Sequence, residues 1–272
     1  MRGLRFLQAT KAWRAVLAAI AVGCGGDGLV WTDPLTLAAG ATDARLVVDE
    51  HGRAAFVVDT SVGAQPAADG RACPGSVRMS RQQDATIVAA WWTVRDDSSA
   101  ALVAAVSEDG GGTWGTVVRV DTLDVSTAGC RRPAPSIAAS AGFVHIAYSM
   151  RGPEGSGVFY AHSMTQGRRF EPPVAIVYGE RLTAVAVSAD EGIVGVVYED
   201  PNGRAPQIGL AISRDWGHIF AHRIRGSTGI GAAALPQVAV TGRQIAVSWL
   251  QRARGAEPAA RATRIVRVGR LS

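Results

Sequence analysis

One eight-residue turn pattern occurs three times along this chain, at intervals of about 50 residues. The first copy reads Ser107-Glu-Asp109-Gly-Gly111-Gly-Thr113-Trp114. The second copy occupies residues 163–170 and has Thr165 in place of the aspartate. The third copy keeps Ser213, Asp215 and Gly217, and it has Phe220 in place of the tryptophan. Turns repeated at a fixed interval indicate a fold built from similar units in sequence.

The residue types in this pattern suit a tight turn between two strands. The Asp109 carboxylate is short enough to accept hydrogen bonds from backbone N–H groups a few residues further on. Gly111 can adopt a positive φ without a steric cost, and the Trp114 ring can pack over the turn. We therefore expect Asp109 and Asp215 to stabilise turns rather than to take part in catalysis.

Short apolar runs rich in Val, Ile and Ala fill the intervals between the turns. Gly, Pro, Asp and Asn separate these runs about every ten residues, which is typical of an all-β fold. The 50-residue repeat favours a β-propeller of about five four-stranded blades, with six as the alternative. Residues 31–37 resemble the strand after Trp114, and we expect them to close the ring by pairing with the C-terminal strand. The expected strands are residues 45–49, 54–60, 76–80, 86–92, 101–106, 116–120, 135–140, 144–150, 157–162, 173–178, 182–188, 193–198, 207–212, 221–225, 236–241, 244–250 and 261–268.

The repeated pattern resembles the Asp-box, or BNR repeat, of sialidase-like β-propellers. This resemblance implies a propeller in which the boxes lie on the face away from the substrate. It assigns a structural role to Ser107, Asp109, Gly111, Thr113, Trp114, Ser213, Asp215, Gly217 and Phe220. Typical sialidases have six blades and are longer, so this chain departs from the family pattern in its blade count.

The N-terminal segment has the layout of an export signal. Residues 1–23 carry four basic side chains and no acid, and an apolar run over residues 15–22 precedes Cys24. The small residue before Cys24 resembles a bacterial lipobox, which implies a lipidated mature N-terminus, a flexible tether over residues 24–30 and a propeller over residues 31–272. A lipid anchor would hold the protein at the cell envelope, and Gly25 is compatible with the outer membrane. The alternative is an ordinary cleaved signal or an uncleaved anchor.

The charge of the chain gives little support to nucleic acid binding. The export segment contributes most of the net charge of +5, so the remainder of the chain is nearly neutral.

Cys73 and Cys130 each precede the first strand of a blade, and the two blades are neighbours, so in an exported protein these cysteines can form a disulfide. The alternative is two separate thiols. No spacing typical of a metal site occurs, and we expect neither a metal nor a cofactor.

Loops between second and third strands, and between successive blades, lie on one face of a propeller, around its axis. The resemblance implies that three arginines at blade mouths hold a substrate carboxylate, and Arg71, Arg132 and Arg181 best match such a set. Trp92, in the pair Trp91-Trp92, is a candidate for stacking on a sugar. The catalytic candidates are Tyr198, Glu199, Asp200 and Asp97. Adjacent strand residues point to opposite sides, so Tyr198 and Glu199 cannot both face the axis of a regular strand.

These observations leave two function classes open. The first is a non-catalytic binding or scaffold propeller that recognises a glycan or a protein at the axial face. The second is a sialidase-like glycoside hydrolase of the exo-α-sialidase type. Convergence of the three arginines with an acid and a tyrosine in one pocket would separate them.

Overall fold

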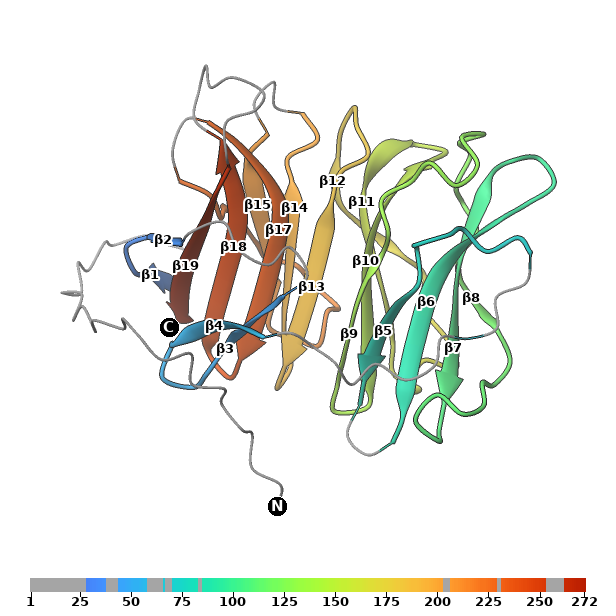
Figure 1. Cartoon of the computed structure of the whole chain (residues 1–272), viewed down its shortest axis with the longest axis horizontal. Helices are drawn as coiled ribbons and strands as arrows, with labels where there is room; N and C mark the ends of the chain where they lie inside the picture. The colour runs from blue at the N-terminus through green and yellow to red at the C-terminus, as the bar shows by residue number, and fades with distance from the viewer. Residues whose placement is uncertain are drawn as a thin grey trace.

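The computed structural model describes residues 28–37, 44–57, 66, 70–82, 85–202, 206–228, 231–252 and 262–272. Every regular element in these residues is a β-strand, and the strands form antiparallel sheets (Figure 1). The prediction of an all-β fold built from four-stranded units is confirmed. The predicted export signal, the tether up to residue 27 and Cys24 lie outside the described residues.

Five sheets follow one another along the chain, and we call them blades I to V. Blade I contains β3 (Arg45–Val48) and β4 (Ala54–Val57). Blade II contains β5 (Arg78–Arg81), β6 (Ile87–Val94), β7 (Ala100–Ser107) and β8 (Val118–Asp121). Blade III contains β9 (Ser136–Ser140), β10 (Phe143–Gly152), β11 (Gly155–Ser163) and β12 (Val174–Tyr178). Blade IV contains β13 (Val185–Asp190), β14 (Ile193–Glu199), β15 (Ile208–Ser213) and β16 (His222–Arg225). Blade V contains β17 (Ala232–Thr241), β18 (Gln244–Arg252) and β19 (Thr263–Leu271), with β1 (Leu29–Trp31) and β2 (Leu35–Leu37) beside β19.

The N-terminal strands complete the last blade, as the sequence predicted. Trp31 lies opposite Gly269 in the β1–β19 pair, and Leu35 lies opposite Val266 in the β2–β19 pair. This pairing covers the outer edge of the C-terminal strand, which would otherwise present unpaired backbone groups to solvent. In the described part of the chain, blade I has two strands, and the second ends at Val57.

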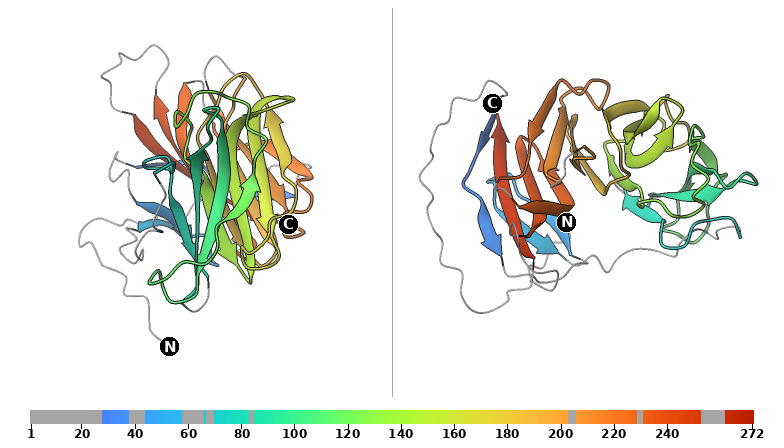
Figure 2. Two further views of the ribbon diagram at one scale, coloured as in Figure 1. Left: turned by 90° about the vertical axis from the view of Figure 1, so that its right-hand side faces the viewer. Right: turned by 90° about the horizontal axis from the view of Figure 1, so that it is seen from above.

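The first strands pack on one another in the order β5, β9, β13, β17 and β3, and the blades stand side by side in this order (Figure 2, right). Side-chain hydrogen bonds join them across the blades. The Ser80 hydroxyl accepts from the Ala139 N–H at 3.0 Å, and the Ser188 hydroxyl accepts from the Val240 N–H at 3.0 Å. The Gln237 amide oxygen accepts from the Leu46 N–H at 3.1 Å. These polar side chains therefore satisfy backbone N–H groups between the first strands of neighbouring blades.

The middle strands of blade II are apolar on both faces, because blade III covers one face and side chains of blade II itself, such as those of Met79 and Trp114, cover the other. The first six residues of β6 are buried, and β7 is buried along nearly its whole length. Trp91 and Trp92 do point to opposite faces, but both rings are buried, at 3% and 1% exposure. Trp92 is not exposed for stacking on a sugar, because blade III covers the face of the sheet that carries it.

A disulfide joins Cys73 to Cys130, with a Cα–Cα distance of 5.2 Å. It connects the segment before β5 to the segment before β9, so it covalently links the chain segments that lead into blades II and III. Disulfides persist in oxidising compartments, and this bond indicates an extracytoplasmic protein. Among the described residues, no helix is long and apolar enough to cross a membrane.

Candidate functional site

The three repeated turns have the same hydrogen-bond geometry. In blade II, the Ser107 hydroxyl accepts from the Gly111 N–H at 2.8 Å, and Asp109 Oδ1 accepts from the Thr113 N–H at 2.8 Å. Blade IV repeats this with Ser213, Gly217 and Asp215. In blade III, the Thr165 hydroxyl accepts from the Arg169 N–H at 2.9 Å and so replaces the missing carboxylate. The Asp109 and Asp215 carboxylates therefore stabilise turns, as their residue types indicated.

The Asp109 carboxylate makes the turn of blade II sensitive to acid. Hydrogen bonds from the Thr113 backbone N–H and hydroxyl, and from Ser107, lower the pKa of Asp109 to about 2 from its usual 3.8. A lowered pKa means that the charged form stabilises the folded state. This contribution is fully present above pH 3.8 and is lost as the pH falls through about 2.

We therefore expect Asp109→Asn to destabilise the protein at pH 6, and we expect the difference from wild type to shrink on acidification towards pH 2. Urea unfolding of both proteins at several pH values measures this difference. Glu108→Gln is the control, because Glu108 is an exposed neighbour that accepts no hydrogen bond from the turn backbone. A difference that stays constant from pH 6 to pH 2 would contradict a role for the charged carboxylate.

The three candidate arginines have separate partners. Arg71 pairs with Asp96 at 3.0 Å, and both side chains are mostly exposed. Arg181 donates to the backbone oxygens of Pro201 and Asp200, at 3.3 and 3.2 Å. Arg132 pairs with Asp124, and neither side chain is more than 1% exposed. The interpretation of Arg132 as a ligand-binding residue needs correction, because a buried guanidinium already held by a carboxylate cannot capture a second one.

The side chains of the catalytic candidates form hydrogen bonds to nearby backbone groups or pack in the core. Glu199 accepts from the Leu235 N–H at 2.9 Å, and Asp200 accepts from the Asn202 N–H at 2.9 Å. Asp97 accepts from the Ser99 N–H at 2.9 Å within the loop after β6. Tyr198 is 8% exposed and packs in the core shared by blades III and IV. The structure does not bring these four side chains together as a site.

A buried polar pair lies near the disulfide and was missed by sequence reasoning. The Tyr148 hydroxyl donates to Asp121 Oδ2 at 2.5 Å, and the two residues are 0% and 4% exposed. Burial raises the pKa of both groups. The Trp92 ring packs edge-on against Tyr148, and its indole N–H donates to the Pro133 carbonyl at 2.9 Å. Trp92 is therefore a core residue, and its assignment as a sugar-stacking platform needs correction.

Histidines cluster between blades III and IV. His145 bonds through Nδ1 to the Tyr160 hydroxyl at 2.7 Å, and the His162 ring lies 4.8 Å from that of His218. Burial lowers the pKa of His145 to about 3, so this imidazole is neutral at physiological pH. No group of three or more His, Cys, Asp or Glu side chains within the described ranges is arranged to hold a metal ion.

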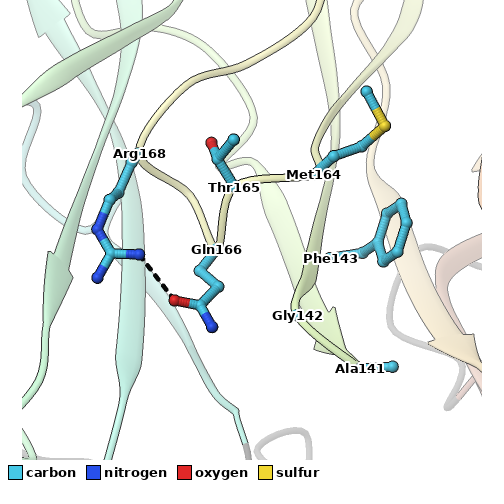
Figure 3. A pocket seen from close by; sticks show the side chains of 7 residues that line it. All are labelled: Ala141, Gly142, Phe143, Met164, Thr165, Gln166 and Arg168. Carbon is cyan, nitrogen blue, oxygen red and sulfur yellow. Dashed lines mark hydrogen bonds between the residues drawn. The ribbon is translucent and has the colours of Figure 1, made fainter.

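Two hollows lie on the side of the molecule that carries the repeated turns. The larger one, of about 500 Å³, lies between the turns of blades II and III and is lined by Glu108, Trp114 and Arg168 among others. The smaller one, of about 290 Å³, lies beside the turn of blade III (Figure 3). Figure 3 shows Arg168 and Gln166 joined on one side of this hollow, with Met164 and Phe143 on the other. No sequence signal other than the repeat itself pointed to these hollows.

No family model and no curated protein matches this chain. Solved structures resemble it at low identity. A protein of unknown function from Dyadobacter fermentans is 14% identical, with a TM-score of 0.49 over 69% of this chain and 50% of that one. The NanB sialidase from Streptococcus pneumoniae is also 14% identical, with a TM-score of 0.44 over 73% of this chain and 30% of that one. The GH43B protein of the Bacteroides ovatus xyloglucan PUL is 15% identical, with a TM-score of 0.41 over 78% and 40%. This chain thus spans half or less of each of these proteins, and the likeness to sialidase and GH43 β-propellers concerns fold alone.

Proposed function

We propose that this protein is an exported β-propeller that acts as a non-catalytic binding or scaffold module for a glycan or a protein. The disulfide supports export. The lipobox-like residues before Cys24 support a lipid anchor in the outer membrane, with residues 31–272 as the propeller domain. Exposed charged side chains of the axial loops, such as those of Arg71 and Arg181, are the proposed contacts for a ligand on that face.

The burial and position of the tyrosines argue against the hydrolase alternative. A retaining sialidase needs a tyrosine nucleophile that can reach the sugar and a carboxylate beside it. The chain has four tyrosines, and Tyr148, Tyr160 and Tyr198 are buried. Tyr178 is exposed and bonds to Glu154 at 2.7 Å, but it lies on β12, the strand of blade III furthest from the ring centre. None of these four tyrosines, all of which lie in the described ranges, is therefore accessible at the axis.

We expect the purified protein not to hydrolyse a general fluorogenic sialoside between pH 4 and pH 8. Fluorescence release measures turnover, and an established bacterial sialidase assayed in parallel is the positive control. Turnover that is abolished by Tyr198→Phe or Arg181→Ala would contradict the binding role and support the hydrolase.

Mass spectrometry of the membrane fraction tests the anchor, since a lipidated protein begins at an acylated Cys24.

A further inference from the structure

The turns of blades III and IV carry large side chains at a position that favours glycine. The third residue after the turn serine has a positive φ in all three blades, at 76° for Gly110, 57° for Gln166 and 63° for Trp216. Blade II meets this geometry with glycine, whereas the other two blades place a long amide and an indole there. A residue other than glycine is strained in this conformation, and retained strain is a reason to look for function.

One of these side chains lines the smaller hollow, and the other packs on a residue that lines it. Gln166 lines it directly, and its backbone N–H donates to the Gly142 carbonyl at 3.1 Å. Trp216 stacks on Phe143, which lines the same hollow, with ring centroids 4.5 Å apart and planes inclined by 22°. Of the two substitutions for glycine, Gln166 thus supplies a hydrogen-bonding amide to the hollow, and Trp216 supports the Phe143 ring that lines it.

Arg168 connects this hollow to the larger one, because it lines both. One of its nitrogens, Nη1, donates to Gln166 Oε1 at 2.7 Å, and the other, Nη2, pairs with Glu108 of blade II. The Arg168 and Glu108 side chains are 54% and 71% exposed, so their pairing is weak and can give way to a ligand. Beyond this pair, Trp114 lines the larger hollow above the apolar floor of Val106 and Val118.

The linings of the two hollows combine the planar polar groups of Arg168, Glu108 and Gln166 with the aromatic side chains of Trp114 and Phe143. Guanidinium, carboxylate and amide groups can each bond two neighbouring hydroxyl groups of a sugar. Aromatic rings offer flat faces on which the C–H side of a sugar can stack, and such mixed linings are typical of small-molecule sites. Arg168 lines both hollows, which measure about 500 and 290 Å³, so a ligand that fills both is an oligosaccharide rather than a single sugar.

We infer that the surface formed by Trp114, Glu108, Arg168, Gln166 and Phe143, which we call the turn-side groove, binds an oligosaccharide chain. This inference rests on the proposed binding role and assigns the ligand to the side opposite the axial loops. The ligand class is a glycan, because the groove supplies stacking faces and hydroxyl-binding groups with little net charge.

The test is binding of the purified protein to a panel of immobilised oligosaccharides of four or more units, covering neutral hexose, neutral pentose and sialylated chains. The best-bound chain is then titrated in solution, with tryptophan fluorescence as the readout. We expect Arg168→Ala to weaken binding roughly tenfold, as loss of a charged hydrogen-bonding group does. Arg169→Ala is the matched control, since Arg169 belongs to the same turn, pairs with Glu171 and does not line either hollow.

Gln166→Gly separates a binding role from a structural one. Glycine relieves the strained φ, so we expect the melting temperature of this variant to be unchanged or higher while its affinity falls severalfold. Equal affinity of wild type, Gln166→Gly and Arg168→Ala would overturn the turn-side groove. If Arg71→Ala alone abolishes binding, the ligand lies on the axial face, and the inference fails while the proposed function stands. If no oligosaccharide of the panel binds to wild type, the inference is overturned, and a protein partner is left as the proposed ligand.

Discussion

Arg132→Ala is expected to destabilise the protein by about 3–5 kcal/mol, the usual cost of leaving one member of a buried ion pair alone. The Arg132 guanidinium and the Asp124 carboxylate are both inaccessible to solvent. Arg132 also donates to the Ser126 carbonyl at 2.6 Å, so its loss leaves a buried carboxylate and a backbone oxygen without their donor. The free energy of unfolding in urea at pH 7 measures the effect.

Arg71→Ala is the matched control for this prediction. Its ion pair with Asp96 is exposed, and exposed pairs contribute at most about 1 kcal/mol. The double variant Arg132→Met and Asp124→Leu removes both charges, and we expect it to be more stable than Arg132→Ala. If Arg132→Ala unfolds like wild type but loses affinity for a ligand, the interpretation of Arg132 as a ligand-binding arginine would be restored.

The repeat predicted the fold because each part of it reports a local physical requirement. Turn residues at a fixed interval and short apolar runs specify strands and their ends, so the four-stranded units were identified along the chain. The pairing of β1 and β2 with β19 followed from the likeness of residues 31–37 to the strand after Trp114. The predicted bounds were less accurate for the first strand of each blade. β17, for example, begins at Ala232, four residues before its predicted start.

The candidate site could not be predicted in the same way, because burial in loops depends on packing between blades. Arg132 lies in the connection between blades II and III, where no periodic pattern indicates whether a side chain points inward. Alternation along β6 places Trp91 and Trp92 on opposite faces, but it carries no information on what covers each face. The pairing of Tyr148 with Asp121 likewise joins different blades, 27 residues apart. Contacts of this kind appear only once the blades are placed side by side.

The glycine of the repeated turn illustrates how much of a local signal is in fact a contact between blades. Gly217 has a φ of 91°, so the conformational reason for glycine holds. A Cβ at this position would also lie 1.8 Å from the Tyr160 hydroxyl of blade III. Tyr160 is fully buried and is held by His145 and by the Phe220 ring, whose centroid is 4.8 Å away. The turn of blade IV therefore packs directly on the preceding blade.

We expect Gly217→Ala to destabilise the protein by about 2–5 kcal/mol, because backbone strain and overpacking against Tyr160 add together. Gly75→Ala is the matched control. Gly75 has a φ of 71°, but a Cβ at this position would have no neighbouring atom within 4 Å, so this change tests the backbone strain alone and should cost roughly 1–2 kcal/mol. Urea unfolding of the two variants measures the difference. Equal destabilisation would show that Tyr160 can move aside, and the glycine would then be required only for its conformation. A larger loss in Gly217→Ala would mean that the repeated turn fixes the spacing between blades as well as the path of the chain.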